Sequence, residues 1–154
     1  AEPMANTQAM CTSFKGELLV GHHNFGTGVV RGATTADTFK AALYLASATV
    51  NASTTAYSAT NEVSGTGYTA GGATVTNATA PTTSGTTAIW TPSASIAWTT
   101  VTLGTSFDAV LIYNSTQSNK AVSVHTFGAT TVTAGNFTLT MPANDASNAL
   151  LRIA

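Results

Sequence analysis

The sequence predicts an all-β protein, an antiparallel β-sandwich of jelly-roll or Ig-like type with one short N-terminal α-helix. Short runs of β-branched and aromatic residues recur between clusters of Gly, Asn, Ser and Thr, and several runs alternate apolar and polar residues with a period of two. The 154 residues are the size of about one domain. We therefore expect an N-terminal arm with the helix at residues 1–25 and a single sandwich domain at residues 26–154.

The helix is expected over Gln8–Leu19. Met10, Phe14 and Leu18 recur every four residues, so they form one apolar stripe on a helix. An isolated helix of this length is marginally stable. The stripe is thus expected to pack either on the sheet domain or on a neighbouring subunit, and the sequence leaves both open.

The strands follow from alternation and from the turns between them. Thr38–Leu45 is expected to be a strand, and Phe107, Ala109, Leu111 and Tyr113 are expected to share one face of a central strand. Further strands are expected at Val122–Val124, Phe137–Met141 and Leu150–Ile153, with turns at Asn51–Thr54, Ser64–Gly72 (a glycine hairpin), Thr82–Gly85, Asn114–Asn119 and Ala134–Asn136.

The chain carries very little charge. Charged residues make up 7% of the sequence, against roughly a quarter in an average soluble domain. The five basic residues are scattered and the net charge is −1, so no nucleic-acid partner is expected. Few charges and a net charge near zero favour association of copies, and we expect a homo-oligomer, with a trimer as the favoured form.

The residues that could support catalysis are sparse. Six acidic residues and three histidines occur without a recognisable catalytic motif, so no enzyme activity and no cofactor are expected. His22 and His23 would point in opposite directions in an extended chain, so no metal site with His125 is expected either. Cys11 is the one cysteine and is expected to be a small buried side chain.

The apolar segments are short. None approaches the ~20 residues that a membrane-spanning helix needs, and the first residues lack the layout of a secretory signal. Met4 is expected to be the natural start, which would make the first three residues additional ones. No membrane partner is therefore expected.

The aromatic residues allow two interpretations. Trp90, Trp98, Tyr57 and Tyr68 could form a stacking platform for a sugar, or they could belong to the core or to a subunit interface, which is the commoner role. We favour the second interpretation. The residues expected at an interface are Met10, Phe14, Leu18, Phe25, Trp90 and Trp98.

Several segments resemble a known group of proteins. They are Met10–Lys15, Glu17–Leu19, His23–Phe25, Thr38–Lys40, Ala42–Tyr44, Tyr57–Gly72 (YSATNEVSGTGYTAGG), Ala109–Asn114 and Asn148–Ile153. Over most of its length the chain is similar to small β-rich virion structural proteins of tailed bacteriophages. The resemblance implies a β-sandwich subunit built into the particle and supplies no catalytic residue.

The expected function is that of a virion structural protein assembled in the bacterial cytoplasm. The favoured role is a capsid decoration or cement protein that binds the major capsid protein and stabilises the shell through multimeric surface contacts, with residues 5–25 as the anchor. The alternative is a tail-associated or fibre-associated structural or receptor-binding module. A carbohydrate-binding module is a more distant alternative.

Overall fold

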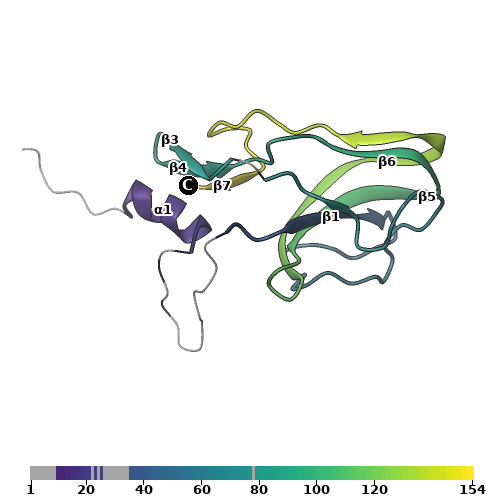
Figure 1. Ribbon diagram of the computed structural model, residues 1–154, viewed down its shortest axis with the longest axis horizontal. Helices are drawn as coiled ribbons and strands as arrows, with labels where there is room; N and C mark the ends of the chain where they lie inside the picture. The colour runs from purple at the N-terminus through teal and green to yellow at the C-terminus, as the bar shows by residue number, and fades with distance from the viewer. Residues whose placement is uncertain (1–9, 22, 24, 26–34, 78) are drawn as a thin grey trace, which may run out of the picture. The chain divides into compact units, whose positions relative to one another are not determined.

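The computed structural model describes residues 10–21, 23, 25, 35–77 and 79–154 (Figure 1). This part of the chain is mostly β, with one short helix and two antiparallel sheets. It divides into two compact units: unit 1 contains the described residues up to 25 with 80–91 and 142–154, and unit 2 contains 35–77, 79 and 92–141. The expected domain boundary between residues 25 and 26 stays a prediction, because residue 26 lies outside the described residues.

Unit 2 contains a four-stranded sheet with the order β2-β1-β5-β6. All neighbouring strands in it are antiparallel. The strands are β1 (Phe39–Leu45), β2 (Ala73–Thr74), β5 (Ile96–Asn114) and β6 (Lys120–Leu139).

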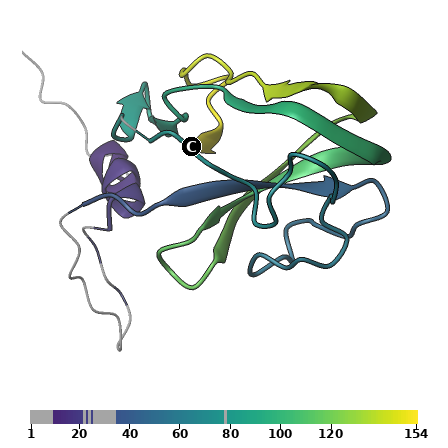
Figure 2. The same cartoon turned by 45° about the vertical axis from the view of Figure 1, so that its right-hand side comes forward.

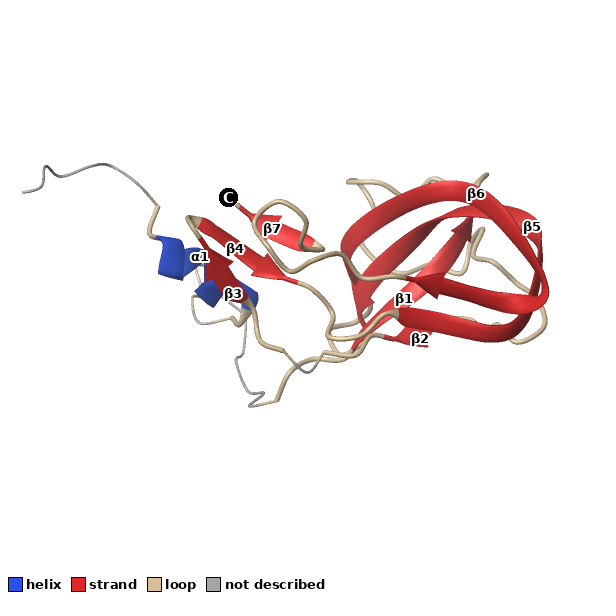
Figure 3. Ribbon diagram, turned by 90° about the horizontal axis from the view of Figure 1, so that it is seen from above, coloured by secondary structure: helices blue, strands red, loops and turns tan. Residues whose placement is uncertain are grey.

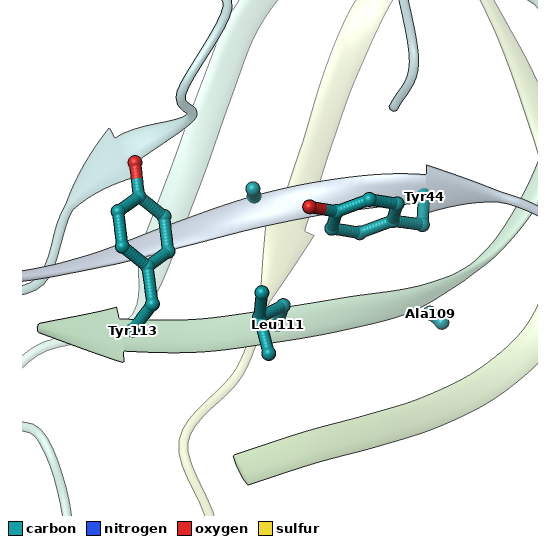
Figure 4. Packing of buried hydrophobic residues seen from close by; sticks show 5 residues of the cluster. Tyr44, Ala109, Leu111 and Tyr113 are labelled. Atoms are coloured by element: carbon teal, nitrogen blue, oxygen red, sulfur yellow. The ribbon is translucent and has the colours of Figure 1, made fainter. Parts of the chain in front are cut away.

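Strand β1 confirms the expectation for Thr38–Leu45 and lies inside the sheet. Residues Ala41 to Tyr44 are at most 1% exposed, so both faces of the strand are covered. On one face, Tyr44 packs with Leu111 and Tyr113 of β5 (Figure 4). Burying a side chain such as Leu111 contributes about 1.5–3 kcal/mol, so these contacts hold β1 against β5.

Strands β5 and β6 form one long hairpin whose two strands bend together (Figure 2). The turn expected at Asn114–Asn119 connects them and is confirmed. The turn expected at Ala134–Asn136 is wrong: these residues continue β6, and the register between β5 and β6 shifts there. Ala134 has a positive φ of 44°, so the local turn signal corresponds to an irregularity inside a strand.

The bend changes the partners of Phe107. A register shift separates Phe107 from Ala109, and Phe107 is not part of the core cluster that contains Ala109 and Leu111. Its ring instead packs edge-to-face against Phe137, with ring centroids 4.9 Å apart, and against Phe127 at 5.9 Å. The expected grouping is confirmed for Ala109, Leu111 and Tyr113, which pack in one cluster, and stays a prediction for Phe107.

The segment from residue 61 to residue 74 follows the outer edge of β1. Glu62 bridges Tyr44 antiparallel, and β2 pairs with Lys40 and Ala41. The glycine-rich residues between Glu62 and β2 loop away from this edge and do not form the expected hairpin. At its end, a Cβ on Gly72 would lie 1.8 Å from the carbonyl oxygen of Ala41, and Gly72 has a φ of 82°, so only glycine fits.

Unit 1 contains a three-stranded antiparallel sheet with the order β3-β4-β7 and the helix α1 (Figure 3). The helix contacts β3 and β4. The last strand confirms the one expected at the C-terminus. The bounds are α1 (Thr12–Leu19), β3 (Thr82–Ser84), β4 (Thr87–Trp90) and β7 (Leu151–Ile153).

Helix α1 is shorter than expected. It begins at Thr12, so Met10 and Cys11 precede it, while Gln8 and Ala9 lie outside the described residues. It ends where Gly21, with a φ of 75°, turns the chain and donates its N–H to the carbonyl of Leu18. The observed end at Leu19 confirms the expected end of the helix.

Candidate interaction surface

Large apolar side chains in and beside helix α1 are exposed to solvent. Met10 is 57% exposed, Leu18 39%, Val20 49% and Phe25 83%. They are four of the five large hydrophobic side chains that are exposed in the described part of the chain. Together with Phe14 we call them the α1 surface.

The expected stripe is therefore not covered by the sheet of unit 1. The buried residue of α1 is Lys15, whose Nζ donates a hydrogen bond of 2.6 Å to the carbonyl oxygen of Thr86. Leu18 lies on a neighbouring part of the same helix face but is 39% exposed. The sequence left open whether the stripe packs on the sheet domain or on a neighbouring subunit. In this arrangement its exposed side chains are accessible to another molecule.

An aromatic group holds Phe25 at this surface. The ring of Phe14 packs edge-to-face on His23 and on Phe25, with centroid distances of 4.8 and 5.9 Å. His23 also contacts the carboxylate of Glu17 through Nε2. Phe25 thus has a position defined by neighbouring rings although most of its own surface is uncovered.

The two tryptophans expected at an interface lie elsewhere. Trp90 in β4 and Trp98 in β5 are each 6% exposed. Trp98 stacks on Tyr68 and lies 6.0 Å from the ring of Phe137. Their role at an interface stays a prediction, and the α1 surface is defined without them.

A buried carboxylate organises the aromatic residues of unit 2. Glu62 is 8% exposed. Its Oε1 accepts a hydrogen bond of 2.7 Å from the hydroxyl of Tyr57, and its Oε2 accepts one of 2.7 Å from Tyr68 and one of 2.9 Å from the N–H of Gly71. Three donors replace the water that a carboxylate loses on burial.

The tyrosines around Glu62 are held in their phenol form. Burial first, and then the hydrogen bond to Glu62, raise the pKa of Tyr57 and of Tyr68 above the ordinary value. Burial also raises the pKa of Tyr44, which donates to the carbonyl of Ser58, and of Tyr113, which donates to the carbonyl of Gly71. The cluster fastens residues 57–71 to the sheet.

Tyr57 and Tyr68 are two of the four residues that could have formed a stacking platform for a sugar, and both are engaged in contacts within unit 2. Tyr57 stacks on Tyr113 with centroids 4.8 Å apart, and Tyr68 stacks on Trp98 at 6.4 Å. Both hydroxyls are directed at Glu62. The role of Glu62 was not predicted from the sequence, where its one local signal is an isolated acidic residue between Tyr57 and Tyr68.

A serine and a histidine lie side by side on β6. Ser123 and His125 are 2.9 Å apart on β6, and burial lowers the pKa of His125. Among the described residues, no three His, Cys, Asp or Glu side chains come together as metal ligands.

Cys11 is exposed, so its expected burial is wrong. In the described chain, no helix has the length and apolar character that crossing a membrane requires.

No family model, no curated protein sequence and no solved structure matches the chain.

Proposed function

We propose that this chain is a bacteriophage virion structural protein, most simply a capsid decoration or cement protein that binds the major capsid protein through the α1 surface. The observation that carries the proposal is the exposed apolar side chains at α1, above all Phe25 at 83% exposure. The resemblance of the sequence to small virion proteins of tailed phages supplies the class of partner.

The chemistry of the chain agrees with a role in assembly. Charged residues are 7% of the sequence and the net charge is −1, so little long-range repulsion opposes the packing of many copies on one particle. Covering Phe25 on a partner contributes about 1.5–3 kcal/mol, and each further side chain of the α1 surface adds to it.

The mechanism is thermodynamic linkage. A protein that binds the assembled shell and not its free subunits lowers the free energy of the assembled state, in proportion to the logarithm of its concentration over the dissociation constant. No chemical step is required. The virion is the corresponding location, and several copies acting together, as the expected trimer, would multiply the effect.

We also propose that unit 2 is an antiparallel sandwich in the jelly-roll or Ig-like class. The bent β5–β6 hairpin supports this, because Phe107, Phe127 and Phe137 pack together from different parts of the two strands.

Binding to particles that lack the protein tests the anchor. Phe25→Ala and Leu18→Ala should each weaken binding about tenfold, which corresponds to about 1.4 kcal/mol. Val122→Ala is the matched control, because Val122 is 38% exposed, close to the 39% of Leu18, but belongs to unit 2. Unchanged binding of both α1 variants would contradict the anchor.

The number of copies in purified virions tests the function itself. Quantitative mass spectrometry should find a copy number near that of the major capsid protein. A small multiple of the tail symmetry would instead support the tail or fibre module. Absence from the particle would overturn the structural role and leave the carbohydrate-binding module to be tested with glycans.

A further inference from the structure

Strand β6 has an outer edge that its own unit covers only at the start. The tripeptide Thr55–Tyr57 pairs there with Asn119–Ala121 through hydrogen bonds of 2.9 and 3.0 Å. Beyond Ala121, none of the described strands or bridges pairs with this edge. Its outward N–H and C=O groups therefore have the geometry to receive a further strand.

The edge lacks the usual chemical protection against pairing. Residues 121–139 contain no Lys, Arg, Asp, Glu or Pro, the residues that commonly block edge strands. Its irregularities limit where a partner can pair, because the register to β5 shifts at Val122 and again after Thr126. The uninterrupted piece is Ser123–Thr126, which pairs residue by residue with Ala109–Ile112.

A groove runs beside the start of this piece. It is lined by uncharged residues, among them Asn51, Ala52, Val122 and Ser123. Val122 is 38% exposed, and Val124 is half-buried although Leu111, directly opposite on β5, is fully buried. A strand added at the edge would cover both valines, whose side chains the described fold leaves partly exposed.

We propose that the occupant is β6 of a second copy of this chain, paired antiparallel about a two-fold axis near Val124. A neutral edge and a neutral groove match a neutral strand, and β6 itself is such a strand. Two identical edges meet here without like charges, which would destabilise the pair if they were present. The proposal does not rest on a role in the virion.

The size of the contact sets its strength. A pairing of about four residues on each copy buries less than the roughly 1,200 Å² of a standard stable interface, so the pair should be reversible and its population should depend on concentration. A two-fold contact also gives an even number of copies. It therefore differs from the trimer expected from the sequence.

Charge placed at Val122 tests the pairing in the full-length chain. Sedimentation velocity should show a monomer–dimer equilibrium for the unmodified protein and for the neutral control Val122→Thr. Val122→Lys and Val122→Glu should each weaken it about tenfold or more, because the added strand covers this position and a charge buried there has no partner.

Hydrogen exchange locates the contact. The amides of residues 123–126 should exchange more slowly as the protein concentration rises, and this change should be lost in Val122→Lys. A monomer at all concentrations, a trimer, or a dimer that Val122→Lys leaves intact would each overturn the proposal. None of these results bears on particle binding by the α1 surface, so the two proposals fail separately.

Discussion

The hydroxyl of Tyr68 donates a hydrogen bond of 2.7 Å to Oε2 of Glu62, six residues earlier in the chain. The same hydroxyl oxygen accepts a hydrogen bond of 3.0 Å from the N–H of Leu43 in β1. One side chain therefore joins the buried carboxylate to the strand. The first two predictions follow from this link.

Removing the hydroxyl of Tyr68 should destabilise unit 2. Tyr68→Phe takes a donor from Glu62 and an acceptor from Leu43, and each buried group left unpaired costs about 1–3 kcal/mol. Tyr57→Phe is the control, because it removes one donor from the same carboxylate and leaves β1 untouched. Urea unfolding should show the larger loss for Tyr68→Phe, and equal losses would contradict the role of the Leu43 contact.

Stability should fall at alkaline pH. Burial first, and then Glu62, raise the pKa of Tyr57 and of Tyr68 in the folded state above the unfolded value of about 10. The contribution is therefore complete below pH ~10 and is lost as the pH rises above it, because the unfolded chain releases these protons first. Urea midpoints measured across this range should fall, and the fall should be smaller in the Tyr57→Phe, Tyr68→Phe double variant.

Two glycines with positive φ should respond very differently to alanine. Gly72→Ala places a Cβ 1.8 Å from the carbonyl oxygen of Ala41, so the backbone must move and we expect a loss above ~3 kcal/mol or no folding. Gly85 also has a positive φ, 59°, but no atom lies within 4 Å of its added Cβ. Gly85→Ala should cost only about 1–2 kcal/mol. Thermal unfolding of both variants measures the two losses. Similar losses would show that the positive φ, and not the close approach to Ala41, determines the loss of stability.

The unfolding free energy should also fall on mild acidification. Burial lowers the pKa of His125 below its ordinary value of about 6.5. The unfolded chain then binds a proton that the folded chain binds less readily, so stability present above pH ~6.5 is lost as the pH falls toward the folded pKa. His125→Gln should reduce this dependence, measured as the difference between urea midpoints at neutral pH and at about pH 5. An identical difference in both proteins would exclude His125 as its source.

The sequence located the elements whose signal is local. The apolar run ending in Leu45, the turn after Asn114 and the last strand before Ile153 could be predicted, because residues close in the chain decide them. The stripe of α1 was also visible, but the sequence could not say whether the sheet or a partner covers it. The exposure of Met10 and Leu18 in the folded chain shows that the sheet of unit 1 leaves them largely uncovered.

Long-range contacts decided the rest of unit 2. Ala134–Asn136 has the composition of a turn, yet it continues β6, because Gly135 pairs with Val101 of β5 and the N–H of Ala134 donates to Oγ1 of Thr102. The burial of Glu62 likewise depends on tyrosines and a backbone N–H that converge only when residues 57–71 fold back on the sheet.

The sequence by itself therefore determined a β-rich chain with one helix and little charge, because composition and periodicity are properties of neighbouring residues. The tertiary structure decided which edge of β6 stays open, which side chains of α1 are exposed and how Glu62 is satisfied. These properties depend on register and on contacts between distant residues, which local propensity does not encode.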